Sequence, residues 1–260
     1  MNVEALVRQL ESLGVRRGGV LLVHMSYRAV RPVDGGPLGL IDALRLALGP
    51  AGTLVMPAWT ADDDAPFDAA RTPASPDLGV TAEMFRKLPD VQRSNHPFAF
   101  AALGPEAEAI TADPLPIPPH RLESPIGRIW ERNGQILLLG VGHDSNTTIH
   151  LAEALAHVPY AVPKHITVLR EGVPVRIDYG ENDHCCRRFA LADEWLRARG
   201  LQREGRVGNA EARLIDSQDV VAVVRKHLAR DPLLFLHHDS CDECLEARRS
   251  VTTAPTEHFV

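Results

Sequence analysis

Three short apolar runs separated by helical patterns are the feature that most constrains how this chain can fold. The runs Val20–Val23, Thr53–Met56 and Ile136–Leu139 have the length of buried strands and consist almost entirely of aliphatic residues. Strands that are apolar on both faces are typical of a parallel sheet covered by helices on each side. A helical pattern at Gly39–Leu48 separates the first two runs, so a strand, a helix and a strand follow within about 40 residues. This unit predicts a right-handed crossover in a covered sheet.

The same alternation continues along the rest of the chain. Further predicted helices cover 3–13, 82–88, 106–111, 150–157, 183–199 and 217–229, and further predicted strands cover 97–103, 166–170, 173–179 and 233–236. The strands at 166–170 and 173–179 form a predicted hairpin that turns at Glu171-Gly172. Two irregular loops, 60–78 and 113–125, interrupt the pattern, and loops of this length are often functional. We expect one α/β domain over residues 1–260.

Composition and charge narrow the classes of partner. The net charge of −6 and the pI near 6.0 argue against a nucleic-acid binder, which usually has a basic face, and suit a cationic ligand. The sequence contains neither an apolar run of the roughly 18–20 residues that a membrane span needs nor an N-terminal signal-peptide pattern. We therefore expect a cytoplasmic protein that binds no membrane and no nucleic acid. Four cysteines in a chain of this length are too few for a disulfide framework.

A glycine-rich turn follows the third apolar run and leads into a predicted helix. This turn, 140–150, contains Thr147 and ends at His150. Ligands of open α/β sheets bind beyond the carboxyl ends of strands, and free N–H groups at a helix start favour anionic or carbonyl oxygens. We interpret His150 as a functional group that faces such a ligand. The alternative is a structural histidine beside an ordinary helix cap.

Two acidic clusters suit a cationic ligand. Glu181 and Asp183 share one face if the chain is extended there, and a carboxylate beside an imidazole would orient it and raise its basicity. Asp62, Asp63 and Asp64 form a run in the first long loop that suits a polycation. The alternatives are a helix N-cap for the first cluster and a solvated acidic loop for the second.

A Cys-x-x-Cys pair near the C-terminus predicts half of a zinc site. Cys241 and Cys244 would need two more ligands, and thiolates and imidazoles are the ligands that zinc prefers. His237 and one of Cys185 and Cys186 could supply them, because adjacent helical residues point about 100° apart. We take Cys186, His237, Cys241 and Cys244 as the predicted structural zinc site. The alternative is a pair of ordinary thiols.

Two further patches offer hydroxyl, imidazole and guanidinium groups. Ser26 and Arg28 follow the first strand, and Ser94 and His96 precede an extended segment. Such groups suit phosphate and amide ligands.

Together, these segments resemble the aminoglycoside 3-N-acetyltransferase family, also called the antibiotic N-acetyltransferases. The resemblance covers almost the whole chain, with the matching stretches in the same order. In detail, the sequence looks closest to the type IV subgroup, whose members acetylate apramycin, gentamicin and tobramycin. The matching stretches are Leu21-Leu-Val-His-Met-Ser-Tyr-Arg28, Gly52-Thr-Leu-Val-Met-Pro57, Arg93-Ser-Asn-His-Pro-Phe98, Gly140-Val-Gly-His-Asp-Ser-Asn-Thr-Thr148, His150-Leu-Ala-Glu153, Glu181-Asn-Asp-His-Cys-Cys186 and Cys241-Asp-Glu-Cys244.

The resemblance implies an antibiotic-resistance enzyme with a known type of fold and reaction. The fold would be an α/β/α sandwich around a central mixed sheet, of the family's own type and not the GNAT type. The reaction would transfer acetyl from acetyl-CoA to the 3-amino group of 2-deoxystreptamine aminoglycosides. A monomer or a homodimer is expected.

The resemblance also implies roles for individual residues. His150 would be the general base, Glu181 the carboxylate that supports it, and Thr147 a donor to the thioester or its oxyanion. Aminoglycoside ammonium groups would be held by Asp63, Asp183 and Asp62, and coenzyme A by Ser26, Arg28, Ser94 and His96.

Two rival functions and one rival mechanism remain. A zinc-dependent hydrolase of a cationic amide substrate would use His143, Asp144 and His150 as ligands and Glu181 as base, although this spacing matches no standard zinc motif. A non-enzymatic binding module would only sequester a cation. We expect direct attack by the amine and not an acyl-cysteine route, because no cysteine falls within the implied catalytic loops by sequence.

Overall fold

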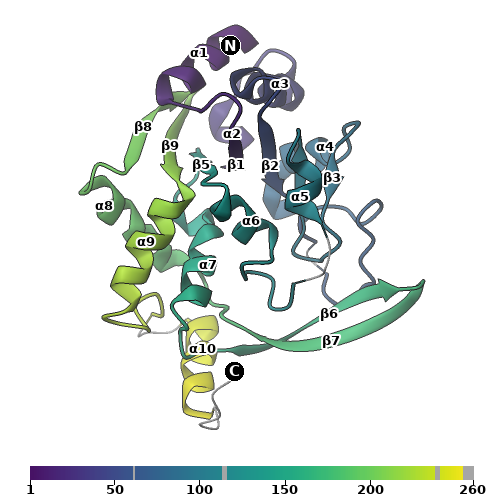
Figure 1. The fold of residues 1–260 in the computed structure, drawn as a ribbon, viewed down its shortest axis with the longest axis vertical. Helices are drawn as coiled ribbons and strands as arrows, with labels where there is room; N and C mark the ends of the chain where they lie inside the picture. The colour runs from purple at the N-terminus through teal and green to yellow at the C-terminus, as the bar shows by residue number, and fades with distance from the viewer. Residues whose placement is uncertain (61, 113–115, 238–240, 254–260) are drawn as a thin grey trace.

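The computed structural model describes residues 1–60, 62–112, 116–237 and 241–253, with side chains up to residue 251. Within these residues, seven strands form one sheet in the order β3 (Gln92–Arg93), β4 (Phe100–Leu103), β2 (Thr53–Pro57), β1 (Val20–Met25), β5 (Gln135–Leu139), β9 (Ala210–Asp216) and β8 (Gln202–Val207). A separate two-stranded sheet consists of β6 (Val162–Arg170) and β7 (Val173–Glu181). Figure 1 shows helices around the large sheet and the two-stranded sheet extending away below it.

Three parallel strands form the centre of the large sheet and confirm the predicted apolar runs. β1 (Val20–Met25) lies between β2 (Thr53–Pro57) and β5 (Gln135–Leu139). The register pairs Leu22 with Val55 on one side and with Ile136 on the other. Every residue of β2 and β5 is buried, as expected for strands that are covered on both faces.

Helices cover both faces of this sheet. On one face, α1 (Val3–Leu13) and α3 (Gly36–Leu48) pack with Leu21 into one apolar core. On the other face, α7 (Thr148–Leu155) and α9 (Ser217–Leu228) pack with Leu22 into a second core. Neighbouring strand residues point to opposite faces, so Leu21 and Leu22 belong to different cores. The predicted α/β/α sandwich is confirmed.

Antiparallel strands border the parallel centre and make the sheet mixed, as predicted. β4 (Phe100–Leu103) pairs with β2 and carries the short strand β3 (Gln92–Arg93) at its outer edge. β9 (Ala210–Asp216) pairs with β5, and β8 (Gln202–Val207) forms the opposite edge.

The sequence analysis missed the β8–β9 hairpin and wrongly predicted a strand at 233–236. β8 is an edge strand whose four inner residues are all exposed, so it lacks the alternating or continuous apolar pattern of a strand. Phe235 and Leu236 are buried, but the backbone there forms turns, with the Leu236 amide donating to the Leu233 carbonyl at 2.9 Å. This apolar segment therefore fills the core without pairing in a sheet.

The predicted hairpin is confirmed and is longer than expected. β6 (Val162–Arg170) and β7 (Val173–Glu181) pair throughout their length, with Ile166 opposite Ile177. The first long loop packs against β6, where the Phe67 amide donates to the Thr167 carbonyl at 3.1 Å. β7 ends at Glu181, which is buried and lines the main cavity.

The remaining helices are mostly short. The helix predicted at 183–199 begins later, as the 3₁₀ helix η3 (Arg187–Ala190) followed by α8 (Leu191–Arg197). The others are α2 (Tyr27–Val30), η1 (Pro76–Leu78), α4 (Gly79–Phe85), α5 (Ala107–Thr111), α6 (Pro125–Glu131), η2 (His143–Ser145) and α10 (Asp242–Thr253). Among the described residues, no helix has the length and apolar character needed to cross a bilayer.

Candidate active site

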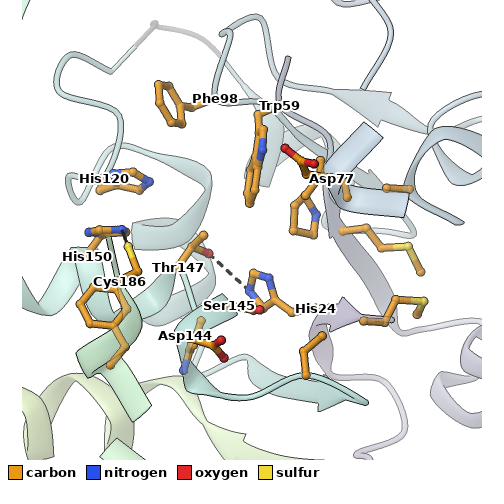
Figure 2. A pocket seen from close by; sticks show the side chains of 18 of the residues that line it. His24, Trp59, Asp77, Phe98, His120, Asp144, Ser145, Thr147, His150 and Cys186 are labelled. Atoms are coloured by element: carbon orange, nitrogen blue, oxygen red, sulfur yellow. Dashed lines mark hydrogen bonds between the residues drawn. The ribbon is translucent and has the colours of Figure 1, made fainter. Parts of the chain in front are cut away.

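A cavity of about 340 Å³ lies at the carboxyl ends of the central strands. β1 contributes His24, the turn after β5 contributes Asp144 and Thr147, and α7 contributes His150 (Figure 2). The end of β7 and the segment after it contribute further lining residues, namely Glu181, Asp183 and Cys186. This is the position at which ligands bind in open α/β sheets.

The turn between β5 and α7 is held by side-chain hydrogen bonds and by close packing. The Asn146 side chain accepts from the Thr148 amide at 3.2 Å and lies 3.2 Å from Nδ1 of His143. Nε2 of His143 lies 2.9 Å from the Gln202 amide oxygen, so both of its ring nitrogens are engaged by neutral groups. A Cβ atom on Gly140 would lie 2.5 Å from that of Ala29, so only glycine fits there.

These contacts bear on two residues that the sequence analysis singled out. His143 is only 1% exposed, and both of its ring nitrogens contact side chains within the protein. The rival hydrolase would instead need a ring nitrogen of His143 to bind zinc. Thr147 is directed into the cavity, and its hydroxyl lies 3.4 Å from Nε2 of His24. Burial, with a contribution from His143, lowers the pKa of His24 to about 3, so His24 is neutral near pH 7.

His150 and Glu153 form the central pair of the site. Nδ1 of His150 lies 2.7 Å from Oε2 of Glu153, one helical turn along α7. Glu153 is fully buried and also accepts from Tyr160 Oη at 2.5 Å, His184 Nε2 at 2.8 Å and Asn182 Nδ2 at 3.3 Å. Burial acts to raise the pKa of Glu153, but the hydrogen bonds from His150 and His184 outweigh it and hold the pKa at about 2. Glu153 is therefore a fixed carboxylate behind the imidazole.

Glu181 does not pair with His150, so the implied pairing of these two residues is corrected. Oε1 of Glu181 lies 3.0 Å from Nδ1 of His120, and its other oxygen accepts from Tyr179 Oη at 3.2 Å. The ring of His120 stacks on that of His150, with centroids 4.8 Å apart (Figure 2). Glu181, the last residue of β7, therefore contacts His120, while Nδ1 of His150 is engaged by Glu153.

The sequence analysis did not assign a role to Glu153 or His120. Glu153 follows His150 at a spacing of three residues, which places two side chains on one helix face, so its position was readable from the sequence. His120 lies in the irregular loop 113–125, where no periodicity indicates which way a side chain points.

A cysteine lies beside the candidate base, contrary to the expectation. Sγ of Cys186 is 3.3 Å from Nε2 of His150 (Figure 2). Cys186 is the N-cap residue of η3, and its backbone is in the left-handed region with a φ of 57°. Burial acts to lower the pKa of His150, but Cys186 and Glu153 outweigh it and raise this pKa well above its ordinary value. His150 is therefore a stronger proton acceptor than a free imidazole.

Comparison with known proteins identifies the family. Residues 22–229 match the family model described as aminoglycoside 3-N-acetyltransferase. This chain belongs to that family. An aminoglycoside N(3)-acetyltransferase IV from Salmonella sp is 63% identical over 232 residues, covering 89% of each chain. An aminoglycoside N(3)-acetyltransferase III from Serratia marcescens is 33% identical over 85% of this chain and 94% of its own length.

Solved structures agree with this assignment. The apoenzyme of aminoglycoside acetyltransferase AAC(3)-IVa is 61% identical, with a TM-score of 0.94, and the match covers 96% of this chain and 97% of the other. A histidine-to-alanine mutant of the same protein, solved in complex with apramycin, is 59% identical over 94% and 98% of the two chains, with a TM-score of 0.88. AAC-IIIb, solved with CoASH, is 28% identical over 88% and 97%, with a TM-score of 0.82. The family and its non-GNAT fold are therefore as the sequence predicts.

The three predicted drug-binding carboxylates, Asp62, Asp63 and Asp183, have different surroundings in the structure. Asp183 lines the cavity and forms an ion pair with Lys164 of β6. Asp63 is half-buried, and burial raises its pKa, while Lys164 and His165 oppose that rise. Asp62 is exposed, and one of its carboxylate oxygens accepts from the amides of Asp64 and Ala65 at 3.1 and 3.0 Å. Asp62 therefore caps its own loop.

The four predicted coenzyme A residues fall into two groups, one that is accessible to solvent and one that is buried. Ser26 is half-buried and Arg28 is exposed, just beyond the carboxyl end of β1. Ser94 and His96 are buried, and each accepts a hydrogen bond from a nearby backbone amide, from Phe100 at 3.0 Å and from Phe98 at 2.8 Å. These two side chains therefore hold the loop that precedes β4.

The predicted zinc ligands are partly wrong. Cys185, Cys241 and Cys244 form a cluster whose sulfur atoms lie within 4.8 Å of one another, with 3.6 Å between Cys185 and Cys244. Cys186 points the other way, toward His150, because consecutive residues diverge at this turn. His237 is not a member of this cluster, and residues 238–240 lie outside the described part of the chain.

Proposed function

We propose that this protein transfers acetyl from acetyl-CoA to the 3-amino group of 2-deoxystreptamine aminoglycosides such as apramycin, gentamicin and tobramycin. The observation that carries the proposal is the buried His150–Glu153 pair beside a cavity lined by carboxylates. The 63% identity to an aminoglycoside N(3)-acetyltransferase IV supports this choice of substrate.

His150 acts as the general base in this proposal. Because Nδ1 of His150 is held by Glu153, Nε2 is the nitrogen that accepts the proton of the drug amine. The amine reacts in its neutral form, after its ammonium proton has left to solvent. As it attacks the thioester carbonyl and the new N–C bond forms, Nε2 of His150 removes one proton from the nitrogen, and the C–S bond then breaks. His150 returns the proton to the departing thiolate. The hydroxyl of Thr147, on the same turn, donates to the developing oxyanion.

The surrounding carboxylates bind the drug and must be kept apart from the reacting amine. A carboxylate attracts an ammonium group but also stabilises its protonated form, which is not nucleophilic. Asp63 and Asp183 therefore hold ammonium groups other than the one at His150, while Asp62 stabilises the loop that carries Asp63. Glu181 acts through His120, whose ring packs on His150.

Coenzyme A and the cellular setting follow from the same proposal. Ser26 and Arg28 contact the cofactor's polar groups at the carboxyl end of β1, while Ser94 and His96 support the neighbouring loop. The chain forms one acetyltransferase domain over residues 1–260. It works in the cytoplasm, where acetyl-CoA is available, as a monomer or a homodimer.

The proposal also includes a structural zinc ion. Three thiols within 4.8 Å suit zinc, and Cys185, Cys241 and Cys244 would supply three of its four ligands. Such an ion would tie α10 to the start of η3 and take no part in acetyl transfer. Metal analysis of the purified protein should find about one zinc per chain. A Cys244→Ser variant should lose it, whereas metal-free wild-type protein would contradict the zinc site.

The release of free thiol from acetyl-CoA, with and without apramycin, tests the function. Drug-dependent release, with one acetyl group added to the drug by mass spectrometry, is the expected result. A zinc hydrolase would instead cleave the drug without consuming acetyl-CoA, and a binding module would bind the drug without either reaction. Either of those results would overturn the proposal.

A further inference from the structure

An internal cation already occupies one of the proposed drug-binding carboxylates. Nζ of Lys164 pairs with Oδ2 of Asp183, and the two side chains are 35% and 37% exposed. Lys164 lies on β6, directly opposite Tyr179 of β7, whose hydroxyl donates to Glu181. The Lys164 ammonium therefore contacts Asp183, one of the carboxylates that line the cavity.

The next residue on β6, His165, also contacts a carboxylate. Nε2 of His165 lies 2.7 Å from Oδ1 of Asp64, on the acidic loop. One strand thus supplies two basic groups to the two acidic segments, 62–64 and 181–183. Lys164 is the one that contacts a cavity-lining carboxylate.

We propose that Lys164 is an intramolecular competitor of the aminoglycoside and thereby sets the enzyme's affinity and selectivity for the drug. This inference rests on the proposed function, which assigns Asp183 to a drug ammonium. When the drug binds, one of its ammonium groups replaces that of Lys164 on Asp183. The lysine side chain is long and flexible, and a partly exposed ion pair opens at little cost.

This exchange has a consequence for selectivity. A drug that places an ammonium group at Asp183 must displace Lys164, whereas a drug without that group leaves the ion pair intact. Lys164 therefore weakens the binding of the first class of drug and not of the second. A lysine that instead positioned Asp183 for the drug would have the opposite effect, because its removal would weaken drug binding. The two roles differ in the sign of one measurement.

The test is the steady-state KM for apramycin in a Lys164→Gln variant. A competitor role predicts that the KM falls by about two- to fivefold, which is the fold-change expected for a partly exposed ion pair. The kcat and the KM for acetyl-CoA should stay at their wild-type values. A Lys164→Arg variant, which keeps the cation, should retain a KM at or above the wild-type value.

Two controls separate this effect from general electrostatics and from misfolding. Arg170→Gln removes a cation from the exposed tip of the same hairpin, away from Asp183, and should leave the KM unchanged. In an Asp183→Asn background, Lys164→Gln should no longer lower the KM. Thermal unfolding of each variant checks that the fold is retained.

Three results would overturn the inference. They are an unchanged or raised KM in Lys164→Gln, an equal fall in Arg170→Gln, and a persisting fall in the Asp183→Asn background. A failure of the proposed function is a different result, because the wild-type protein would then not acetylate the drug at all.

Discussion

Nδ1 of His150 lies 2.7 Å from Oε2 of Glu153, on one face of α7, and the Glu153 side chain has no exposed surface. This relationship fixes which imidazole nitrogen faces the substrate. It also replaces the Glu181–His150 pairing that the resemblance implies.

Glu153→Gln should lower kcat by about 100-fold to 10,000-fold, because a neutral amide cannot hold the imidazole in the reactive tautomer or stabilise its protonated form. Glu181→Gln should lower kcat by less than about tenfold, since Glu181 contacts His120. Turnover rates of both variants, with thermal unfolding as a control, measure the difference. A larger loss in Glu181→Gln would reverse the assignment.

The pH dependence of kcat/KM should show a rising limb that belongs to His150. Cys186 and Glu153 outweigh burial and raise the pKa of His150, so the protonated, inactive form persists to a higher pH than for a free imidazole. Activity is therefore gained as the pH rises through that pKa. Glu153→Gln removes one of the groups that raise the pKa, so its limb should move to lower pH. A limb that stays in place would argue against His150 as the titrating group.

Cys186→Ala should retain acetyl transfer, even though the sulfur lies 3.3 Å from Nε2 of His150. Direct attack by the amine needs no enzyme nucleophile, so kcat should fall by less than about tenfold, or about 1.4 kcal/mol. Loss of turnover, together with a mass increase of one acetyl group on wild-type Cys186 after treatment with acetyl-CoA alone, would establish an acyl-cysteine route instead.

Asp63→Asn should raise the drug KM by about tenfold or more, because a charge-assisted hydrogen bond to an ammonium group is lost. The kcat should change little, since Asp63 does not contact the base. Asp42→Asn, on the exposed side of α3, is a matched control that removes one carboxylate far from the cavity and should leave the KM unchanged. Equal effects of the two variants would reduce the role of Asp63 to overall charge.

The fold was largely predictable from the sequence because its central strands are continuous apolar runs. β1, β2 and β5 are buried on both faces, and the Glu171-Gly172 turn marks the β6–β7 hairpin. β8 escaped detection because an exposed edge strand needs no apolar pattern. The apolar run at 233–236 was wrongly predicted as a strand, because an apolar segment can be buried either in a strand or in a packed turn.

The site was predictable where a motif fixes local geometry and unpredictable where it depends on contacts between distant segments. His150 and Thr147 lie on one turn and line the cavity as expected. His120 comes from an irregular loop, and Cys186 reaches His150 through a reversal of the backbone at positive φ. Sequence spacing carries no information on either contact.

The turnover of a His150→Ala variant at saturating apramycin and acetyl-CoA tests the central claim most directly. Formation of the 3-N-acetyl product should fall by about 1,000-fold or more, while acetyl-CoA binding stays near the wild-type level. Turnover close to that of the wild-type protein would contradict the assignment of His150 as the general base.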